Sequence, residues 1–262
     1  MSAHGRKIAA LVKRGDDLEA LIDRAPAGHA DLLDRPLPAA LTTEMPDGWF
    51  QSTVVWFNRD GDHIVLNTMR EFQKARNLRA RPRDTLLVLE PEEDQRWIEL
   101  RPRSCSRTRG LSSTSTSSLD STWAPPGTSA AVPAELAAVE HPVRVRLIPT
   151  AVATRPKLFL CDRRTSNPAP EWWNRLRPCE DEPPILDGHR DLLERPIVAV
   201  FTCRLPSGAA QTQPVWCEPD GNDILINTTR ERRRGRNLEL DPKATILIID
   251  PQSSVRWIEI RA

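Results

Sequence analysis

The sequence predicts a mainly β protein with short helices, of the α+β class, in which two small antiparallel barrels follow one another. Three observations carry this prediction. One stretch of the chain occurs twice, each copy contains short strands bounded by turn residues, and the second copy lacks the later part of the first. The chain has 262 residues, which suffices for one large domain or two modest ones. We therefore expect two tandem barrels, of which the second is incomplete.

The repeat is the strongest signal in the sequence. Residues 29–101 align with residues 189–261 at a constant offset of 160 without a gap, and about 32 of the 73 positions are identical. These segments are termed the first repeat and the second repeat. Matched pieces include Arg76-Asn77-Leu78 with Arg236-Asn237-Leu238. A repeat of this length is typical of a duplicated domain and not of a solenoid unit.

Both repeats predict the same order of elements, described here for the first. A short helix around residues 31–33 precedes the first strand, and Pro46-Asp47-Gly48 forms a turn. The turn at residues 59–62 joins two strands into a hairpin, and a short helix over residues 70–79 ends before Pro82. The predicted strands are 37–43, 51–58, 63–68, 84–89 and 95–101. This order is typical of a small antiparallel barrel with helices at its ends.

The remaining segments complete the expected domain organisation. Residues 6–24 have the apolar spacing of a helix, and a final strand of the first barrel is expected near residues 140–150. A stretch rich in proline and charge joins the two copies. The expected units are an N-terminal helix (1–28), a first barrel domain (29–160), a linker (161–186) and a truncated second barrel domain (187–262).

Residues 104–131 differ from the rest of the first domain because they are rich in serine and threonine and show no periodicity. One interpretation is a flexible linker. The alternative is a frameshift, because suitable codons read one base earlier from Ser104 can encode an acidic amphipathic helix and a tyrosine, a residue the sequence lacks. The nucleotide sequence distinguishes the two. A frameshift here would impair or abolish activity.

Composition excludes several functional classes. The net charge of +1 gives no global attraction to nucleic acid or to a membrane surface, and no apolar run approaches the ~18 residues of a membrane-spanning helix. We read no signal peptide at the N-terminus. The five cysteines are scattered without a Cys-x-x-Cys pair, which argues against a disulfide framework or a zinc site. We expect a cytoplasmic protein without metal, nucleic-acid or membrane partners.

The segment from Asn67 to Leu78 carries the clearest chemical signal. A strand ends at Asn67-Thr68 and a basic helix starts within a few residues, so that Asn67 or Thr68 can cap the helix. A helix N-terminus offers free N–H groups to an anion. Arg70 and Lys74 share one helix face and Asn77 follows, which is an arrangement that can hold a phosphate. The alternative is a solvated basic face of no binding function.

The repeated motifs resemble the FMN-binding split barrels related to pyridoxamine 5'-phosphate oxidase, and especially their F420-dependent branch. The likeness rests on Pro-Asp-Gly, Val-Val-Trp, Asp-Gly-Asp, Asn-Thr-x-Arg followed by Lys-Ala-Arg-Asn-Leu, and Leu-Val-Leu-Glu-Pro. It covers residues 29–160 and 187–262. The resemblance implies split barrels that pair as a homodimer with the cofactor in a groove between them. It also implies that the cofactor phosphate lies on the region of Thr68, Arg70, Lys74 and Asn77. The ring system would then pack beside the strand from Gln51 to Trp56.

The sequence departs from the family pattern at the helix. The F420-dependent branch usually has a second arginine two residues after the position of Arg70, where this chain has Phe72. The second repeat has Arg232 there, but it has Arg234 in place of Lys74. The candidate cofactor-binding residues are Gln51, Val54, Trp56, Thr68, Arg70, Lys74, Asn77, Trp216, Thr228, Arg230, Arg232, Arg234 and Asn237. No catalytic residue stands out, which fits hydride chemistry carried by a cofactor.

The aromatic residues have two interpretations. Trp56 and Trp216 follow a valine on a central strand, and Trp97 and Trp257 lie in the last strand of each repeat. They either form a wall for a flat cofactor ring or pack in the core and at interfaces. We favour packing for Trp97 and Trp257. For Trp56, contact with a cofactor ring is more plausible than it is for those residues.

Three functional hypotheses follow from the sequence. The first is an F420- or FMN-dependent oxidoreductase that transfers hydride to a small organic acceptor, with the two barrels forming an intramolecular pseudo-dimer or self-associating. The second is a non-catalytic flavin- or deazaflavin-binding protein, or a degenerate pseudo-enzyme. The least favoured is nucleic-acid binding through residues 230–236, because the net charge is near zero.

Overall fold

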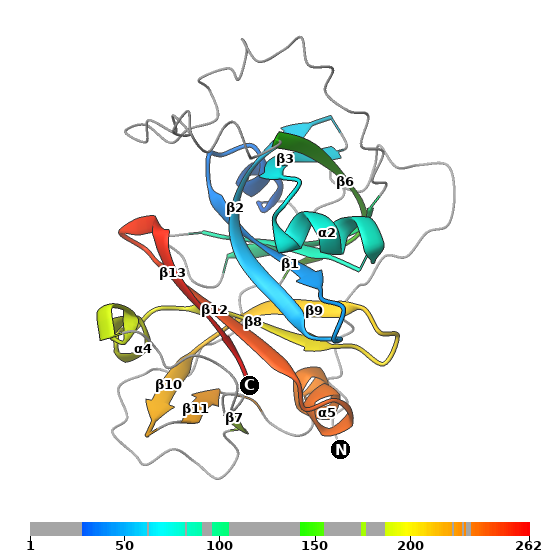
Figure 1. Cartoon of the computed structure of the whole chain (residues 1–262). Coiled ribbons are helices and arrows are strands. Elements are labelled where there is room, and N and C mark those ends of the chain that lie inside the picture. The colour runs from blue at the N-terminus through cyan, green and yellow to red at the C-terminus, as the bar shows by residue number, and fades with distance from the viewer. Residues whose placement is uncertain are drawn as a thin grey trace, which may run out of the picture.

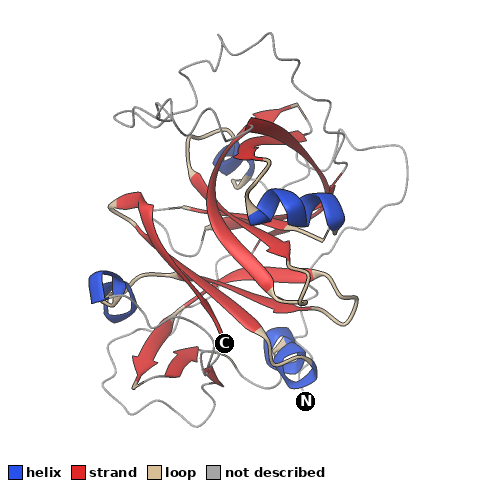
Figure 2. Cartoon of the chain, in the orientation of Figure 1, coloured by secondary structure: helices blue, strands red, loops and turns tan. Residues whose placement is uncertain are grey.

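The structure is a computed structural model, and it is mainly β with a few short helices, as the sequence predicts (Figure 2). The described residues are 28–61, 63–81, 83–90, 96–104, 142–154, 174–176, 187–221, 223–226, 228 and 232–262. The predicted N-terminal helix and nearly all of the segment 104–131 lie outside these residues, as does most of the predicted linker. Among the described helices, none has both the length and the apolarity that crossing a membrane requires.

The first repeat and the strand that follows it form a closed barrel with the strand order β1-β2-β3-β6-β5-β4 (Figure 1). The last strand, β6, pairs with both β3 and β5 and thereby closes the barrel. All the predicted strands are confirmed, with ends shifted by a few residues. The elements are η1 (Ala30–Leu33), β1 (Pro38–Glu44), β2 (Phe50–Asp60), β3 (His63–Met69), α2 (Gln73–Ala80), β4 (Thr85–Leu89), β5 (Trp97–Ser104) and β6 (Pro142–Thr154).

Alternation of side chains along the strands divides the barrel into an inner and an outer face. Leu41 and Val55 pack in the barrel core, whereas their neighbours Ala40 and Val54 point outward. The outward side chains are nevertheless mostly apolar or small. The second repeat covers this outer face.

The second repeat forms the same elements in the same order, but its strands belong to two separate sheets. Strand β2 of the first repeat is continuous, whereas its counterpart is interrupted at Trp216. Pro214 and Pro219 replace Val54 and Arg59 and remove two backbone donors, which explains the weakened strand. The elements are η3 (Asp187–His189), α4 (Asp191–Glu194), β8 (Ala199–Arg204), β9 (Ala210–Val215), β10 (Cys217–Asp220), β11 (Asp223–Ile226), α5 (Arg233–Leu240), β12 (Ala244–Asp250) and β13 (Ser253–Arg261).

A short strand from the predicted linker, β7 (Asn174–Leu176), pairs with β11. In the first repeat Val65 of β3 pairs with Arg146 of β6, and the equivalent Leu225 of β11 pairs with Arg175 of β7. Thus β7 takes, beside β11, the place that β6 takes beside β3. Because β7 does not pair with β13, the second set of strands does not close into a barrel in the described part of the chain.

The outer faces of the two repeats pack against each other (Figure 1). Ala40, Leu87 and Trp97 of the first repeat join Val200 and Leu247 of the second in one buried apolar cluster. Trp97 is only 8% exposed, which confirms the packing interpretation for this residue. The contact hides outer strand faces that would otherwise be exposed, and this burial is the main stabilising contribution at the interface.

Hydrogen bonds across the interface follow an approximate two-fold symmetry. The Thr212 N–H donates to Glu99 Oε1 (2.7 Å), and the Ser52 N–H donates to Glu259 Oε1 (2.6 Å). The two contacts are equivalent, because Glu259 corresponds to Glu99, and Thr212 to Ser52, at the offset of 160. Since a buried N–H without an acceptor is costly, these two carboxylates bind the repeats together in a defined orientation.

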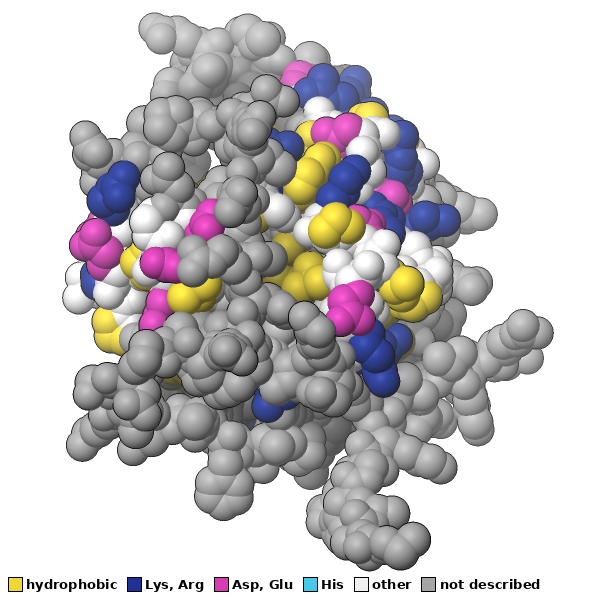
Figure 3. All heavy atoms as spheres, turned by 90° about the horizontal axis from the view of Figure 1, so that it is seen from below, with side chains coloured by type: hydrophobic (Ala, Val, Ile, Leu, Met, Phe, Trp, Pro, Cys, Tyr) yellow, Lys and Arg dark blue, Asp and Glu magenta, His cyan; other side chains and the backbone are white. Residues whose placement is uncertain are grey.

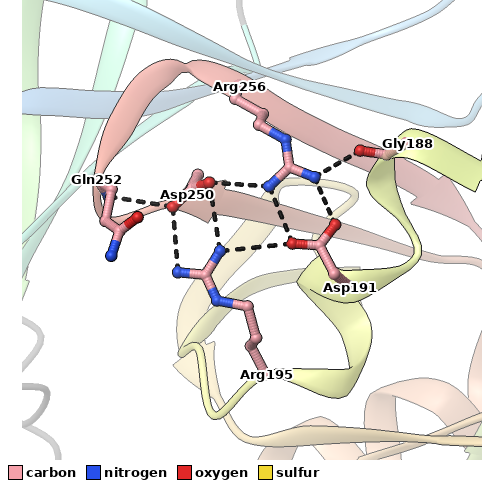
Figure 4. Close-up of polar contacts among 6 residues, drawn as sticks. All are labelled: Gly188, Asp191, Arg195, Asp250, Gln252 and Arg256. Atoms are coloured by element: carbon pink, nitrogen blue, oxygen red, sulfur yellow. Dashed lines mark hydrogen bonds and ion pairs between the residues drawn. The ribbon is translucent and has the colours of Figure 1, made fainter.

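An arginine–carboxylate network fastens the first helix of each repeat to the hairpin of its last two strands. In the second repeat Asp250 accepts hydrogen bonds from Arg195 and Arg256, and Arg256 also binds Asp191 and the Gly188 carbonyl (Figure 4). The first repeat has the equivalent network. These contacts involve neither α2 nor α5, and their role is structural.

We expect Asp250→Asn to lower stability at pH 7 and to flatten the acid dependence of unfolding. The Arg256 hydrogen bond, with help from the Gln252 N–H and Arg195, lowers the pKa of Asp250 from 3.8 to about 2. A lowered pKa contributes stability that is present above pH 4 and lost as pH falls through about 2. Thermal unfolding midpoints of both proteins between pH 7 and pH 2 measure this. Equal midpoints at pH 7 contradict it, and Glu90→Gln is the matched variant in the first repeat.

Candidate functional site

The helix expected to bind phosphate, α2, begins later than predicted and has no side-chain cap. Its N-cap residue is Phe72, with φ −72° and ψ 144°, and the helix starts at Gln73. The prediction that Asn67 or Thr68 caps this helix is therefore wrong, because the turn after β3 separates them from its first residue. A phenyl ring cannot accept a hydrogen bond from the helix amides. The N-terminus of α2 is thus open to an anionic ligand.

Lys74 is a half-buried cation without a carboxylate partner among the described residues. Burial lowers the pKa of its ammonium group below the ordinary 10.5. Its Nζ lies 5.8 Å from the centroid of the Phe72 ring, a contact that offsets only part of the lost hydration. Arg70, in the preceding turn, is exposed. A desolvated ammonium beside an open helix N-terminus is stabilised when an anion binds.

Thr68 lies on the inward face of β3, and its side chain is 6% exposed. Its Oγ1 is buried and has no hydrogen-bond partner among the described residues. A buried hydroxyl without a partner costs about 1–3 kcal/mol. Thr68 therefore has an unused donor and acceptor, which a ligand or an ordered water can satisfy.

Asn77 and Gln51 hold α2 in place and are turned toward each other. Asn77 is 1% exposed, and its Nδ2 donates to Thr43 Oγ1 (3.0 Å) and more weakly to Gln51 Oε1 (3.5 Å). Its Oδ1 accepts from Gln73 Nε2 (2.7 Å). The structure does not gather Asn77 with Arg70 and Lys74 at a single surface. In the second repeat Asn237 makes the equivalent bond to Gln211 (2.8 Å), so this anchor is repeated.

Val54 and Trp56 lie on the face of β2 opposite to Gln51. Val54 packs against the apolar cluster between the repeats, and Trp56 is half-buried on the same outer face. The predicted ring-binding residues are therefore divided between the barrel interior and the boundary between the repeats. Of these, Val54 and Trp56 are the ones that can contact a ligand lying between the repeats.

The second repeat has a more cationic helix N-terminus than the first. Arg232 is the N-cap of α5, is exposed and makes no side-chain cap. Arg234 is 8% exposed and Thr228 is fully buried. Trp216 is half-buried at the break between β9 and β10. Arg230, the remaining candidate here, lies outside the described residues.

Two charged residues of β5 that we did not predict lie at the boundary between the repeats. Glu99 of β5 is 1% exposed and accepts from Arg101 Nη2 (2.5 Å). Burial raises the pKa of Glu99 above its ordinary value, and the positive charges of Arg101 and Arg233 oppose this rise. Arg101 Nε is buried and has no partner among the described residues. The sequence signal was available, because Glu and Arg alternate with apolar residues in both last strands.

The cationic start of α5 acts electrostatically on β5 of the first repeat. Arg233 is the first residue of α5, and its charge acts on Glu99 across the interface. The unused Arg101 N–H adds a donor from the other repeat. A site for an anion at α5 would therefore be composed of residues from both repeats.

Comparison with known protein families shows which family the chain belongs to. The pyridoxamine 5'-phosphate oxidase family matches residues 26–129 and 185–262, which together make up more than half of the sequence. The chain belongs to the pyridoxamine 5'-phosphate oxidase family. Its closed barrel and additional strands are therefore those of a pyridoxamine 5'-phosphate oxidase-like split barrel.

Several solved structures resemble parts of this family member. An F420 reductase is 28% identical over 50% of this chain and 100% of its own, with a TM-score of 0.42. PhzG from Burkholderia lata 383, in complex with tetrahydrophenazine-1-carboxylic acid, is 18% identical over 79% of this chain and 94% of its own (TM-score 0.32). A conserved hypothetical protein from Mycobacterium tuberculosis is 19% identical over 54% of this chain and 94% of its own (TM-score 0.36). A comparison with curated protein sequences gives no match.

The described surface of this pyridoxamine 5'-phosphate oxidase family member has mixed charge. Seen from below in Figure 3, Lys and Arg side chains gather along one side, interspersed with acidic and hydrophobic side chains. The cations needed for a cofactor phosphate are thus local features, in keeping with the net charge of +1. At α2, Lys74 and the Thr68 hydroxyl have unused binding capacity of a kind that suits a phosphate, whereas the unpartnered Arg101 Nε lies beside Glu99 at the boundary between the repeats.

The first barrel also buries a carboxyl group, Asp84, which directly precedes β4. It is 3% exposed, and neither side-chain oxygen has a hydrogen-bond partner among the described residues. Burial raises the pKa of Asp84 from 3.8 to about 7, although its own backbone N–H opposes the rise. Continuing the β1–β4 register by one residue places Asp84 opposite Thr43, which holds Asn77 and hence α2. The second repeat has Ala244 at this position.

We expect Asp84→Ala, which introduces the residue of the second repeat, to stabilise the protein above pH 7. A carboxyl group with a raised pKa binds its proton more tightly when folded, so the folded state loses stability as pH rises from about 4 to 7. The shift from 3.8 to about 7 corresponds to at most ~4 kcal/mol at neutral pH. Urea unfolding at pH 5 and pH 8 measures the effect. A variant less stable than the wild type at pH 8 contradicts it, and Asp84→Asn serves as the isosteric control.

Proposed function

We propose that the protein binds the deazaflavin F420, or alternatively FMN, between its two repeats and transfers hydride between the reduced cofactor and a small organic acceptor. The observation that carries this proposal is the desolvated ammonium of Lys74, which has no carboxylate partner among the described residues and follows an uncapped helix N-terminus. The preference for F420 rests on the sequence motifs. Both cofactors bring a phosphate and a flat tricyclic ring.

The phosphate is expected to bind at the start of α2. Lys74 supplies a cation whose pKa is already lowered by burial, and Arg70 adds a second, exposed cation in the preceding turn. The backbone N–H groups of Gln73 and Lys74 have no side-chain cap and can donate to phosphate oxygens. The Thr68 hydroxyl is the unpartnered polar group on the adjoining strand. Asn77 contributes indirectly, because it fastens the helix to Thr43 and Gln51.

We propose a second, pseudo-equivalent site at the start of α5. Thr228, Arg230, Arg232 and Arg234 occupy the positions of the first site, and Asn237 repeats the anchor. Arg101 and Arg233 support this site by adding positive charge beside Glu99. Arginine presents several donors in a planar fork, so this site suits a ligand with more than one anionic group.

When bound, the cofactor supplies the hydride chemistry, and the residues of the chain bind, orient and exclude water. Val54 and Trp56 lie on the outer face of β2 at the boundary between the repeats, and Trp216 is their counterpart. Half-buried tryptophans offer a flat apolar surface against which a ring system can lie. No acid or base from the chain is assigned to the hydride transfer.

We further propose that the chain is an internal duplication whose two repeats pair as an intramolecular pseudo-dimer in the cytoplasm. Two contacts between the repeats support this, namely Glu99 with Thr212 and Glu259 with Ser52. They join equivalent positions, because the residue numbers of one contact differ from those of the other by 160. Barrel domains at residues 29–160 and 187–262, joined by a linker, follow from the same offset. The open second set of strands supports an incomplete second domain.

A non-catalytic flavin- or deazaflavin-binding protein is the second candidate. Phe72 stands where the F420-dependent branch has an arginine, and the described strands of the second repeat leave their sheet open. Both features reduce the number of groups that position a cofactor. A protein of this kind binds the cofactor without turnover.

The decisive experiment is a titration of the purified protein with F420 and with FMN, followed by absorbance and fluorescence. We expect saturable binding of one of the two, and consumption of the reduced cofactor when small organic acceptors are added. Tight binding without consumption by any acceptor supports the second candidate. Absence of saturable binding to either cofactor overturns both.

A further inference from the structure

We propose that the ion pair between Glu44 and Arg204 makes each repeat recognise the other repeat instead of a copy of itself. The partner that this surface fits is therefore a repeat with the opposite charge at the equivalent position. The proposal concerns the pairing of the repeats and does not depend on cofactor binding or turnover.

The first observation is that this ion pair joins equivalent positions of the two repeats. Thr42 Oγ1 and Thr202 Oγ1, also equivalent, lie 3.4 Å apart and mark the approximate two-fold axis. Two residues further along the same outer faces, Arg204 Nη1 donates to Glu44 Oε1 (3.0 Å). In a symmetric pair of identical repeats each of these positions would face itself. Sequence divergence has thus placed opposite charges where symmetry demands identical ones.

The second observation is that the site around Arg204 is built to hold a guanidinium from the other repeat. Arg204 Nη2 also donates to the Gly48 carbonyl, and its guanidinium carbon lies 4.5 Å from the Phe50 ring centroid. Asp241 of the second repeat orients the arginine through Nε (3.0 Å). The first repeat therefore offers a carboxylate, a carbonyl and a ring face to one cation.

The charges are sufficiently buried to discriminate between partners. Glu44 is 8% exposed, and the Arg204 side chain is 19% exposed. Two first repeats would bring Glu44 against a second Glu44, and two second repeats would bring Arg204 against a second Arg204. Like charges that are removed from water repel strongly and suppress the wrong pairing. Arg83 also approaches Glu44 (3.7 Å), but its side chain is 53% exposed and screens the carboxylate only weakly.

The test uses two full-length variants with different affinity tags. R204E carries glutamate at both equivalent positions, and E44R carries arginine at both. We expect each variant alone to unfold at a lower temperature than the wild type, because its repeats present like charges. Mixed or co-expressed, the two should form a complex of one chain each, in which every glutamate faces an arginine. Light scattering after size exclusion should show this complex in at least about tenfold excess over either homodimer.

The double variant E44R/R204E is the matched control, because it exchanges the charges and keeps the pair. It should regain the size of the wild type and unfold at a higher temperature than either single variant, but below the wild type, because Asp241 and the Gly48 carbonyl now face a carboxylate. Two variants that stay separate on mixing, or that are as stable as the wild type, overturn the proposal.

A neutral series covers the case in which the charge-reversed chains are insoluble even together. E44Q, R204Q and the double variant E44Q/R204Q remove the charges without introducing repulsion. If the ion pair is recognised as proposed, the double variant lowers the unfolding temperature by no more than the larger single change. Additive effects of the two single changes overturn the proposal. Arg83→Gln should leave the unfolding temperature close to that of the wild type.

Discussion

Lys74→Ala should weaken cofactor binding by about tenfold to a hundredfold, because it removes a partly desolvated charge from a phosphate. The helix N-terminus would still bind the phosphate weakly, so Arg70→Ala combined with Lys74→Ala is expected to abolish cofactor retention. Fluorescence titration with F420 and FMN measures both effects. Binding should also weaken at alkaline pH, because burial lowers the pKa of the Lys74 ammonium below 10.5 and its deprotonation removes the charge.

Two controls separate binding from folding. Lys74→Arg keeps the charge and introduces the residue of the second repeat, so we expect it to retain most of the affinity. Arg79→Ala removes an exposed cation from the last turn of the same helix and should leave affinity unchanged. Unchanged retention of the cofactor by the Arg70→Ala, Lys74→Ala double variant removes the site at α2.

Glu99→Ala should destabilise the protein by roughly 3–5 kcal/mol, which is typical when one partner of a buried charged pair is lost. The change leaves Arg101 without its carboxylate and the Thr212 N–H without an acceptor, both at the boundary between the repeats. Because Glu99 is 1% exposed, water cannot easily replace it. Urea unfolding at pH 7 measures the free energy.

Glu99→Gln separates charge from hydrogen bonding, because the amide oxygen can still accept from Thr212. We expect an intermediate loss of stability for this variant. Glu259→Ala is the matched change in the second repeat and should act in the same direction, since Glu259 accepts from Ser52. A loss below ~1 kcal/mol for Glu99→Ala would show that the carboxylates do not bind the repeats together.

Much of the fold could be predicted because its signals are local. Alternating side chains and turn residues predicted β1 to β5, and the likeness of residues 140–150 to the final strand of the family predicted β6. The start of α2 was predicted three residues too early, because a polar side chain at Thr68 is a common cap and the turn that follows has no distinctive residue. The pairing of β7 with β11 had no signal, since it joins only three residues to a distant strand.

The role of the candidate cofactor residues stays a prediction, and the structure shows how they lie. Lys74 and Thr68 were recognised from the junction of a strand and a basic helix, and the structure leaves both with unused binding capacity. Gln51 and Asn77 were grouped with them, but they bind each other because buried amides must be satisfied. Arg101 was missed because its importance depends on the second repeat lying next to it.

The sequence by itself determined the repeat, the family, and the type and order of the strands and helices, because these follow from residue identity and short-range periodicity. Only the tertiary structure decided which face of β2 meets the other repeat, and that Glu99 reaches Thr212 and Glu44 reaches Arg204. Those partners are more than 100 residues apart. Their contacts depend on how two separately formed sets of strands dock, and no local pattern of side chains records that arrangement.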